Sequence, residues 1–265
     1  MIFRILEDQF AQKIQQSKDA DRRFMQLALA LGRRGQGRTW PNPAVGAVIV
    51  KDGVIVGRGW TQAGGRPHAE PEALRRAGEA ARGATLYVTL EPCSHFGRSP
   101  PCADAVVAAG LARVVSAIED PNPEVGGKGH AKLRAAGIAV DVGLCQAEAA
   151  HDHAGHFHRI RDQRPHVILK LAVSADDKIA AGGHKPVAIT GEAARTRVHL
   201  LRAQCDESRI FRGKGKRLIE RIRMKRLTSS EHRRERLDRH AHHIVLRLAR
   251  GQRRTGRLCV KPEHP

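Results

Sequence analysis

The spacing of apolar positions predicts a helix near the start of the chain. In residues 21–35, DRRFMQLALALGRRG, the side chains of Phe24, Leu27 and Leu31 recur at helical intervals. Asp21 stands where an N-cap residue is favoured, and glycines follow the last apolar position. We therefore expect this helix to begin at Asp21.

A pair of strands joined by a tight turn is predicted next. Residues 41–50, PNPAVGAVIV, combine a turn with a continuous apolar run that is typical of a buried strand. The Lys-Asp-Gly sequence at 51–53 suits a hairpin turn, and residues 54–60, VIVGRGW, form the pairing strand.

Helices and strands then alternate. We expect helices from Ala69, from Cys102 and from Gly129, and strands over residues 84–90, 113–120 and 138–143. Two opening strands followed by such alternation predict an α/β layered domain.

A second α/β region is predicted after a connector. The charged stretch at 148–165 predicts a helix that ends at a proline. Residues 166–180, HVILKLAVSADDKIA, then predict a buried strand, and residues 190–206 predict a helix capped by Thr190.

Charge changes this picture only at the C-terminal end. The chain has 47 Lys and Arg against 27 Asp and Glu, a formal net charge of +20. Residues 208–265 contain 19 of these basic residues and only 5 acidic ones. A basic tail can bind nucleic acid, but Phe211 is its only aromatic residue, which counts against base stacking.

Cysteine usage and hydropathy favour a cytoplasmic protein. The chain has five cysteines, an odd number, and its first residues do not read as a secretory signal. No stretch approaches the roughly 20 apolar residues of a membrane helix. We therefore expect neither a disulfide framework nor a membrane partner.

One set of residues has the composition of a catalytic zinc site. His68 and Glu70 lie at the start of a predicted helix, Cys93 follows a predicted strand, and Cys102 opens the next helix. One imidazole and two thiolates leave a fourth zinc position for water. Zinc deaminases combine H-x-E with P-C-x-x-C, and their glutamate carries protons. A structural zinc site would need a fourth ligand, for which His95 is the nearest candidate.

The spacing of the two cysteines distinguishes between families of zinc deaminases. Eight residues separate Cys93 from Cys102, whereas two are usual in nucleoside and nucleic-acid deaminases. This loop, together with PNPAVGAVIV, HAE and DPNPEVGGKGHAKLRAAGI, resembles the bifunctional pyrimidine deaminase–reductase family of riboflavin biosynthesis. The resemblance covers residues 21–206.

The resemblance implies a cytidine-deaminase-like three-layer α/β/α domain followed by an incomplete dihydrofolate-reductase-like α/β domain. It divides the chain into an N-terminal extension (1–20), the deaminase domain (21–147), a connector helix (148–165), the start of the reductase domain (166–207) and an arginine-rich tail (208–265). It also implies deamination of a small-molecule substrate, 2,5-diamino-6-ribosylamino-4(3H)-pyrimidinone 5′-phosphate, and it is compatible with a homo-oligomer.

The resemblance also implies roles for individual residues. Zinc would bind to His68, Cys93 and Cys102, with Glu70 as the proton carrier. Asn42, whose backbone is restricted by the two flanking prolines, is a candidate contact to the substrate ring or ribose. Two loop residues, His95 and Arg98, are candidate contacts to its phosphate. A turn asparagine and a solvated loop are the alternatives.

In the second region, the resemblance implies a reductase that uses NADPH. The motif positions that would line its cofactor and substrate cleft are Lys170, Ala172, Ser174 and Asp176, and Arg202 would hold the substrate phosphate. The family has Asp-Gly where this chain has Asp176-Asp177, so a close backbone approach is in doubt.

The sequence changes character near Glu207. The family continues with a glycine-containing strand–turn and an Asp-Asp-Pro motif, whereas this chain continues with arginine-rich sequence. We therefore predict that residues 208–265 are translated out of frame, a hypothesis that the coding DNA tests directly, and that reductase activity is impaired. The alternative functions are a nucleoside or tRNA-type zinc deaminase, and a basic nucleic-acid-binding protein with a structural zinc.

Overall fold

The computed structural model describes residues 2–170, 172 and 188–206, with backbone only for residues 2–14. The described residues fall into two units, residues 2–167 with 199–206, and residues 168–170, 172 and 188–198. The elements in chain order are α1 (Ile2–Gly32), η1 (Arg33–Gly35), β1 (Gly46–Lys51), β2 (Val54–Trp60), η2 (Ala63–Gly65), α2 (Ala69–Ala77), η3 (Gly78–Ala81), β3 (Thr85–Val88), α3 (Cys102–Ala108), β4 (Arg113–Ser116), α4 (Lys128–Ala135), β5 (Ala139–Val142), α5 (Gln146–Asp152), α6 (Ala154–Arg161) and α7 (Glu192–Ala203).

The first unit is built on a five-stranded sheet in the order β2-β1-β3-β4-β5. The β1–β2 hairpin is antiparallel, as the Lys-Asp-Gly turn predicts, and β1 also pairs antiparallel with β3. The pairs β3–β4 and β4–β5 are parallel. The carboxyl ends of β3 and β4 therefore point the same way, and the loops that follow them meet at one edge of the sheet.

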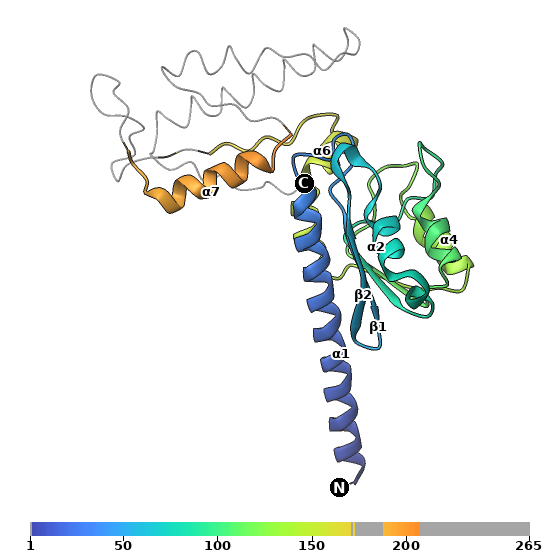
Figure 1. Ribbon diagram of the computed structural model, residues 1–265. Coiled ribbons are helices and arrows are strands. Elements are labelled where there is room, and N and C mark those ends of the chain that lie inside the picture. Colours follow the sequence, from blue (N-terminus) through green and yellow to red (C-terminus); the bar gives the residue numbers. More distant parts are fainter. Residues whose placement is uncertain (1, 171, 173–187, 207–265) are drawn as a thin grey trace, which may run out of the picture. The chain divides into compact units, whose positions relative to one another are not determined.

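Helices cover both faces of this sheet. α1 packs on β1 and β3 (Figure 1). α2 contacts β1 and β2, α3 packs beside α2, and α4 packs beside α3. The first five residues of β1 are buried, as expected for a central strand that is covered on both faces. The predicted three-layer α/β/α fold class is confirmed.

Asp21 is not an N-cap, because α1 begins at Ile2 and Asp21 lies inside it. Its carboxylate accepts hydrogen bonds from Arg113 at 2.8 and 3.1 Å and from the Tyr87 hydroxyl at 2.5 Å. Partial burial opposes ionisation, but the hydrogen bonds from Arg113 and Tyr87 hold the pKa of Asp21 below its ordinary value. The residue therefore ties α1 to two strands.

The predicted connector helix is divided in two. α5 ends at Asp152 and α6 begins at Ala154, with His153 between them at φ −97° and ψ 9°. The His153 ring is buried and its Nε2 lies 3.2 Å from Thr89 Oγ1. Burial lowers the pKa of His153 to about 4.

The predicted strand after Pro165 is absent from its described part. Residues 166–170 have no regular structure, and the side chains of Val167, Ile168 and Leu169 are exposed. A strand needs a partner for its backbone groups, and none is found among the described residues that follow 165.

The helix expected at 190–206 is present as α7, but it begins at Glu192, so Thr190 is not its cap. The Thr190 carbonyl instead accepts a hydrogen bond from Arg195 Nη1 at 3.3 Å. No helix in the described part of the chain is long and apolar enough to cross a bilayer.

Candidate metal centre and deaminase site

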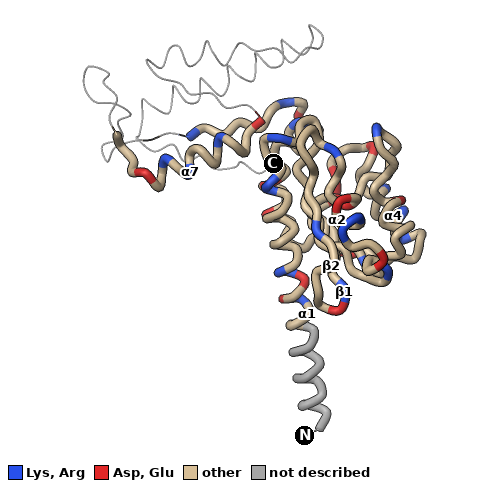
Figure 2. Tube along the Cα trace, in the orientation of Figure 1, with Lys and Arg blue, Asp and Glu red and all other residues tan. Residues whose placement is uncertain are grey.

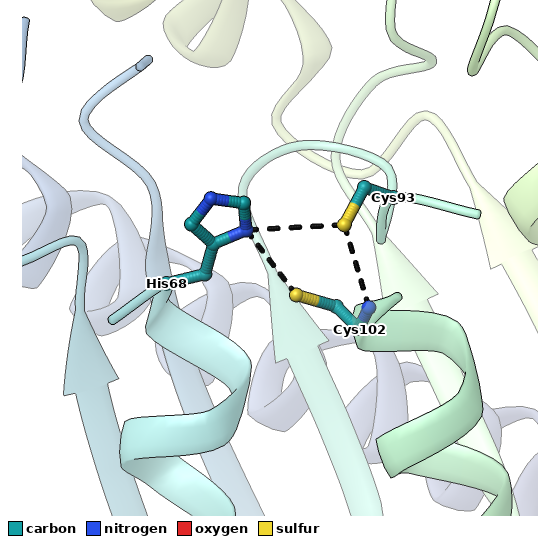
Figure 3. A group of neighbouring side chains, drawn as sticks. All are labelled: His68, Cys93 and Cys102. Atoms are coloured by element: carbon teal, nitrogen blue, oxygen red, sulfur yellow. Dashed lines mark hydrogen bonds between the residues drawn. The ribbon is translucent and has the colours of Figure 1, made fainter. Parts of the chain in front are cut away.

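Three elements of the first unit bring His68, Cys93 and Cys102 together (Figure 3). His68 directly precedes α2, Cys93 lies on the loop after β3, and Cys102 is the first residue of α3. The His68 Nδ1 atom lies 3.3 Å from Cys102 Sγ and 3.8 Å from Cys93 Sγ. The backbone N–H of Cys102 donates to Cys93 Sγ at 3.3 Å.

These separations suit a single zinc ion. Zinc bonds of about 2.3 Å to sulfur and about 2.1 Å to nitrogen, at a tetrahedral angle, place the two ligand atoms roughly 3.6 Å apart. The two observed nitrogen–sulfur distances, 3.3 and 3.8 Å, bracket that value. The donor set is therefore right for zinc in both chemistry and spacing.

The two cysteines of the cluster differ in acidity. A hydrogen bond from the Cys102 thiol, supported by His68, lowers the pKa of Cys93 to about 4. The hydrogen bond to Cys93, together with burial, raises the pKa of Cys102 well above its ordinary value. The Cys93 hydrogen bond also raises the pKa of His68. Zinc binding to these three side chains would release the protons that they carry in the metal-free protein, because metal ligands must be deprotonated.

Glu70 lies in the first turn of α2, two residues after His68, and its side chain is buried. Burial is the main reason why the pKa of Glu70 rises to about 7. A carboxyl with a pKa near neutrality can both accept and donate a proton at working pH. Its position and its ionisation therefore suit proton transfer beside the cluster.

Asn42 reaches the cluster from the loop before β1. Its side-chain Nδ2 donates to the Gly65 carbonyl at 2.8 Å and lies 3.2 Å from His68 Nε2. Its backbone carbonyl accepts a hydrogen bond from the buried Thr39 hydroxyl at 2.9 Å. The Asn42 side chain thus lies against the outer edge of the imidazole, a contact with no signal in the sequence.

The two loop residues proposed for phosphate binding, His95 and Arg98, are exposed. Neither side chain makes a hydrogen bond to any described residue. Sequence reasoning missed Arg66, whose Nη1 donates to Ser99 Oγ at 2.8 Å on the same loop. Its signal is its position two residues before His68 in RPHAE.

Glu91 is a second residue that sequence reasoning missed. It is buried and directly precedes Pro92 and Cys93. Its only sequence signal is its place in EPC, because nothing local shows that an acidic side chain will be buried there.

The reductase candidates are less completely described. Lys170 is exposed, Ala172 is half-buried, and both lie outside regular structure. Arg202 lies in the last turn of α7 and is half-buried. Ser174 and Asp176 lie outside the described residues, as does the tail at 208–265. Along the described chain, Lys and Arg are interspersed with Asp and Glu (Figure 2).

Two family models match this chain. Residues 18–118 match the cytidine and deoxycytidylate deaminase zinc-binding region. Residues 165–241 match the RibD C-terminal domain. The second match runs to residue 241, so the expectation that the resemblance ends at residue 206 is wrong. The out-of-frame origin of the tail stays a prediction.

Individual relatives are similar over the same part of the chain. The riboflavin biosynthesis protein RibD of Escherichia coli is 53% identical over 184 residues, which cover 69% of this chain and 50% of that protein. The diaminohydroxyphosphoribosylamino-pyrimidine deaminase of Buchnera aphidicola subsp. Schizaphis graminum is 48% identical over 145 residues, 55% of this chain and 99% of that protein.

A solved structure of Acinetobacter baumannii RibD is 48% identical, with a TM-score of 0.64, and the match covers 71% of this chain and 52% of that one. The chain thus spans about half the length of the RibD proteins that it matches.

Proposed function

This chain belongs to the RibD family of riboflavin biosynthesis proteins, and we propose that residues 21–147 form a zinc-dependent pyrimidine deaminase. The proposed substrate is 2,5-diamino-6-ribosylamino-4(3H)-pyrimidinone 5′-phosphate, and the product is 5-amino-6-ribosylaminouracil 5′-phosphate. The observation that carries the proposal is the meeting of one imidazole, two cysteine sulfurs and a buried glutamate at one edge of the sheet.

We propose His68, Cys93 and Cys102 as the zinc ligands. When bound, zinc would supply a Lewis acid that makes hydroxide available near neutral pH. The chain's own contribution includes the Cys102 backbone N–H, which donates to Cys93 Sγ and so helps to fix one of the three zinc-binding atoms. Hydrogen bonds from surrounding groups to metal ligands commonly raise the affinity for the metal.

Glu70 is the proposed proton carrier. It would take a proton from water as the oxygen adds to the ring carbon that bears the amino group. It would then deliver that proton to the amine, the carbon–nitrogen bond would break, and ammonia would leave. Glu70 is buried two residues after the proposed ligand His68, where a carboxyl group can take up a proton and pass it on.

Substrate contacts follow from the surroundings of the cluster. We propose that Asn42 meets the ring or ribose, since it lies beside His68. His95 and Arg98 remain proposed phosphate contacts, and their exposure leaves both side chains accessible to a ligand. Arg66, fixed to the same loop through Ser99, adds a third basic group there.

The second region is proposed to belong to an NADPH-dependent reductase, on the basis of its match to the RibD C-terminal domain. Lys170, Ala172, Ser174 and Asp176 stay the proposed cofactor and substrate contacts, and Arg202 the proposed phosphate contact. Because arginine-rich sequence follows Glu207 in place of the family's glycine-containing strand–turn and Asp-Asp-Pro motif, we propose that this second activity is impaired.

Location and assembly are also proposals. A centre built on two free thiols suits the reducing cytoplasm, and we propose that location, with a homo-oligomer as the assembly and no nucleic-acid partner.

A paired assay on the purified chain tests the proposed function. We expect ammonia release from the pyrimidine ribotide, about one zinc per chain, and little or no NADPH oxidation when the deaminated product is supplied. Zinc without ammonia release would support a structural metal site, and release from cytidine or tRNA alone would support the other deaminase class. Full NADPH oxidation would contradict the impaired reductase.

A further inference from the structure

Glu91 is a buried carboxylate at the base of the loop that carries Cys93. Its side chain accepts three backbone hydrogen bonds, from Asp120 at 3.3 Å, Gly127 at 3.0 Å and His130 at 3.1 Å. Its own backbone N–H donates to the Ile118 carbonyl at 3.0 Å. One side chain therefore ties the loop after β3 to the loop after β4 and to the start of α4.

The start of α4 is shaped for this contact. Gly127 is the residue before the helix and has φ 75°, a conformation that costs glycine little. Its N–H and that of His130 are among the first N–H groups of the helix, which have no partner within it. A carboxylate is favoured there because the helix N-terminus is positively polarised.

The same helix lies directly against the ligand loop. A Cβ atom at Gly129 would come within 2.0 Å of the Pro92 carbonyl oxygen and 3.0 Å of Glu91 Oε1. Only glycine allows the helix backbone to approach Pro92 so closely. Pro92 immediately precedes Cys93, so the position of α4 determines where the Cys93 sulfur can lie.

The acidic cluster around Glu91 is not a second cation site. Glu91, Glu119 and His130 bring three potential ligand atoms within 4.8 Å of one another. However, both oxygens of Glu91 already accept backbone N–H groups. These donors present positive partial charge toward the place that a cation would occupy, so they favour the bare carboxylate.

We propose that Glu91 is a positioning residue of the zinc site, which fixes Cys93 by locking the ligand loop to α4. The inference rests on the proposed zinc-binding function of the cluster. Removing the carboxylate would release Pro92 and Cys93 from α4 without removing any ligand. The loss of outer partners of metal ligands typically weakens metal binding, and we expect the weaker binding to appear as faster zinc dissociation.

The test measures zinc transfer from the full-length zinc protein to the chelator 4-(2-pyridylazo)resorcinol. We compare wild type with Glu91→Ala, Glu91→Gln and the control Glu119→Gln. Glu119 is an exposed acid on the loop after β4, and its side chain makes no hydrogen bond to a described residue. We expect release to quicken by about 10- to 100-fold in Glu91→Ala, less in Glu91→Gln, and not in Glu119→Gln.

Two further readouts separate positioning from a general loss of stability. Amide exchange in residues 119–130 should quicken in the metal-free Glu91→Ala protein while exchange in β1 stays unchanged. In the ammonia assay, kcat should fall, whereas KM should change by no more than about twofold. The substitution leaves the groups that bind the substrate intact, and loss of such groups is what raises KM. Gly129→Ala should also speed zinc release, although Glu91 is intact.

Zinc release from Glu91→Ala at the rate of Glu119→Gln would overturn the inference. If Glu91→Ala does not fold, the zinc-release rate of Glu91→Gln is compared with that of Glu119→Gln instead, and equal rates would overturn the inference. Failure of the proposed function is distinguishable: a wild-type protein that binds zinc but releases no ammonia rejects the deaminase, while the chelator assay still tests Glu91.

Discussion

Two runs of branched apolar residues in this chain have opposite surroundings. In β1, Val48 and Ile49 are fully buried, whereas Val167, Ile168 and Leu169 are 66%, 59% and 52% exposed. Both runs read as buried strands by composition. The β1 run is paired on both edges and covered on both faces, while the run at 167–169 has no strand partner among the described residues.

The difference between the two apolar runs shows that a sequence motif forms a defined site only where the surrounding residues are packed. The candidate zinc ligands lie at the ends of elements that pack on β1 and its neighbours, so the core fixes their positions. The reductase candidates Lys170 and Ala172 follow the exposed run and lie outside regular structure. A motif residue acts in a defined geometry only where the packing around it restricts its backbone.

The largest effect is expected at Glu70, on the packed side of this comparison. Glu70→Gln should lower kcat for ammonia release by about 10²- to 10⁴-fold, because the amide cannot carry the proton. Zinc content, measured by atomic absorption, should not change. The matched control is Glu72→Gln on the same helix, whose carboxylate pairs with Arg75 and Arg76. Retention of full activity by Glu70→Gln would exclude the proposed proton transfer.

The contrast between the two apolar runs can be tested with one substitution made twice. Ile49→Ala removes a fully buried side chain and should lower the free energy of unfolding by about 2–5 kcal/mol. Ile168→Ala, at an exposed position, should change it by no more than about 0.5 kcal/mol. Urea unfolding followed by circular dichroism measures both. Equal losses would mean that residue 168 is buried in solution and that the contrast is false.

A smaller effect is expected from pH, through His153. Its pKa is about 4 in the folded protein and about 6.5 when unfolded, so the unfolded chain binds the proton more strongly. This contribution to stability is complete above pH 6.5 and declines as the pH falls toward 4. Between pH 7 and pH 5 the loss should be about 2 kcal/mol.

His153→Gln removes the titrating group while keeping a donor for Thr89. The difference in unfolding free energy between wild type and this variant should therefore shrink as the pH falls from 7 to 5. A difference that does not depend on pH would show that His153 is not buried as a neutral ring.

The smallest effect concerns the attachment of α1. Asp21→Asn weakens the contact with Arg113 and Tyr87 and should cost about 1 kcal/mol at pH 7, since the pair is partly exposed. Asp19→Asn, two positions earlier, loses only a contact with Gln15 and should be neutral within about 0.5 kcal/mol. If the two variants unfold alike, Asp21 is not an anchor of the helix.

Much of the fold of the first unit could be predicted from the sequence alone. The apolar run of β1, the Lys-Asp-Gly turn and the alternation that follows each carry a local signal, and the observed elements agree with them. The donor types His68, Cys93 and Cys102, with Glu70 nearby, were also evident, because metal affinity and acidity are properties of those side chains.

Tertiary structure decided the features that depend on residues far apart in the chain. Asp21 has the sequence of a cap but pairs with Arg113, 92 positions away. Glu91 gives no local sign of burial, yet it binds the start of α4 beside Pro92, the residue before Cys93. The run at 167–169 has the composition of a strand but no partner among the described residues. A sequence fixes which groups a side chain can offer, whereas burial and partnership arise only when distant segments compete for the same space and the same hydrogen bonds.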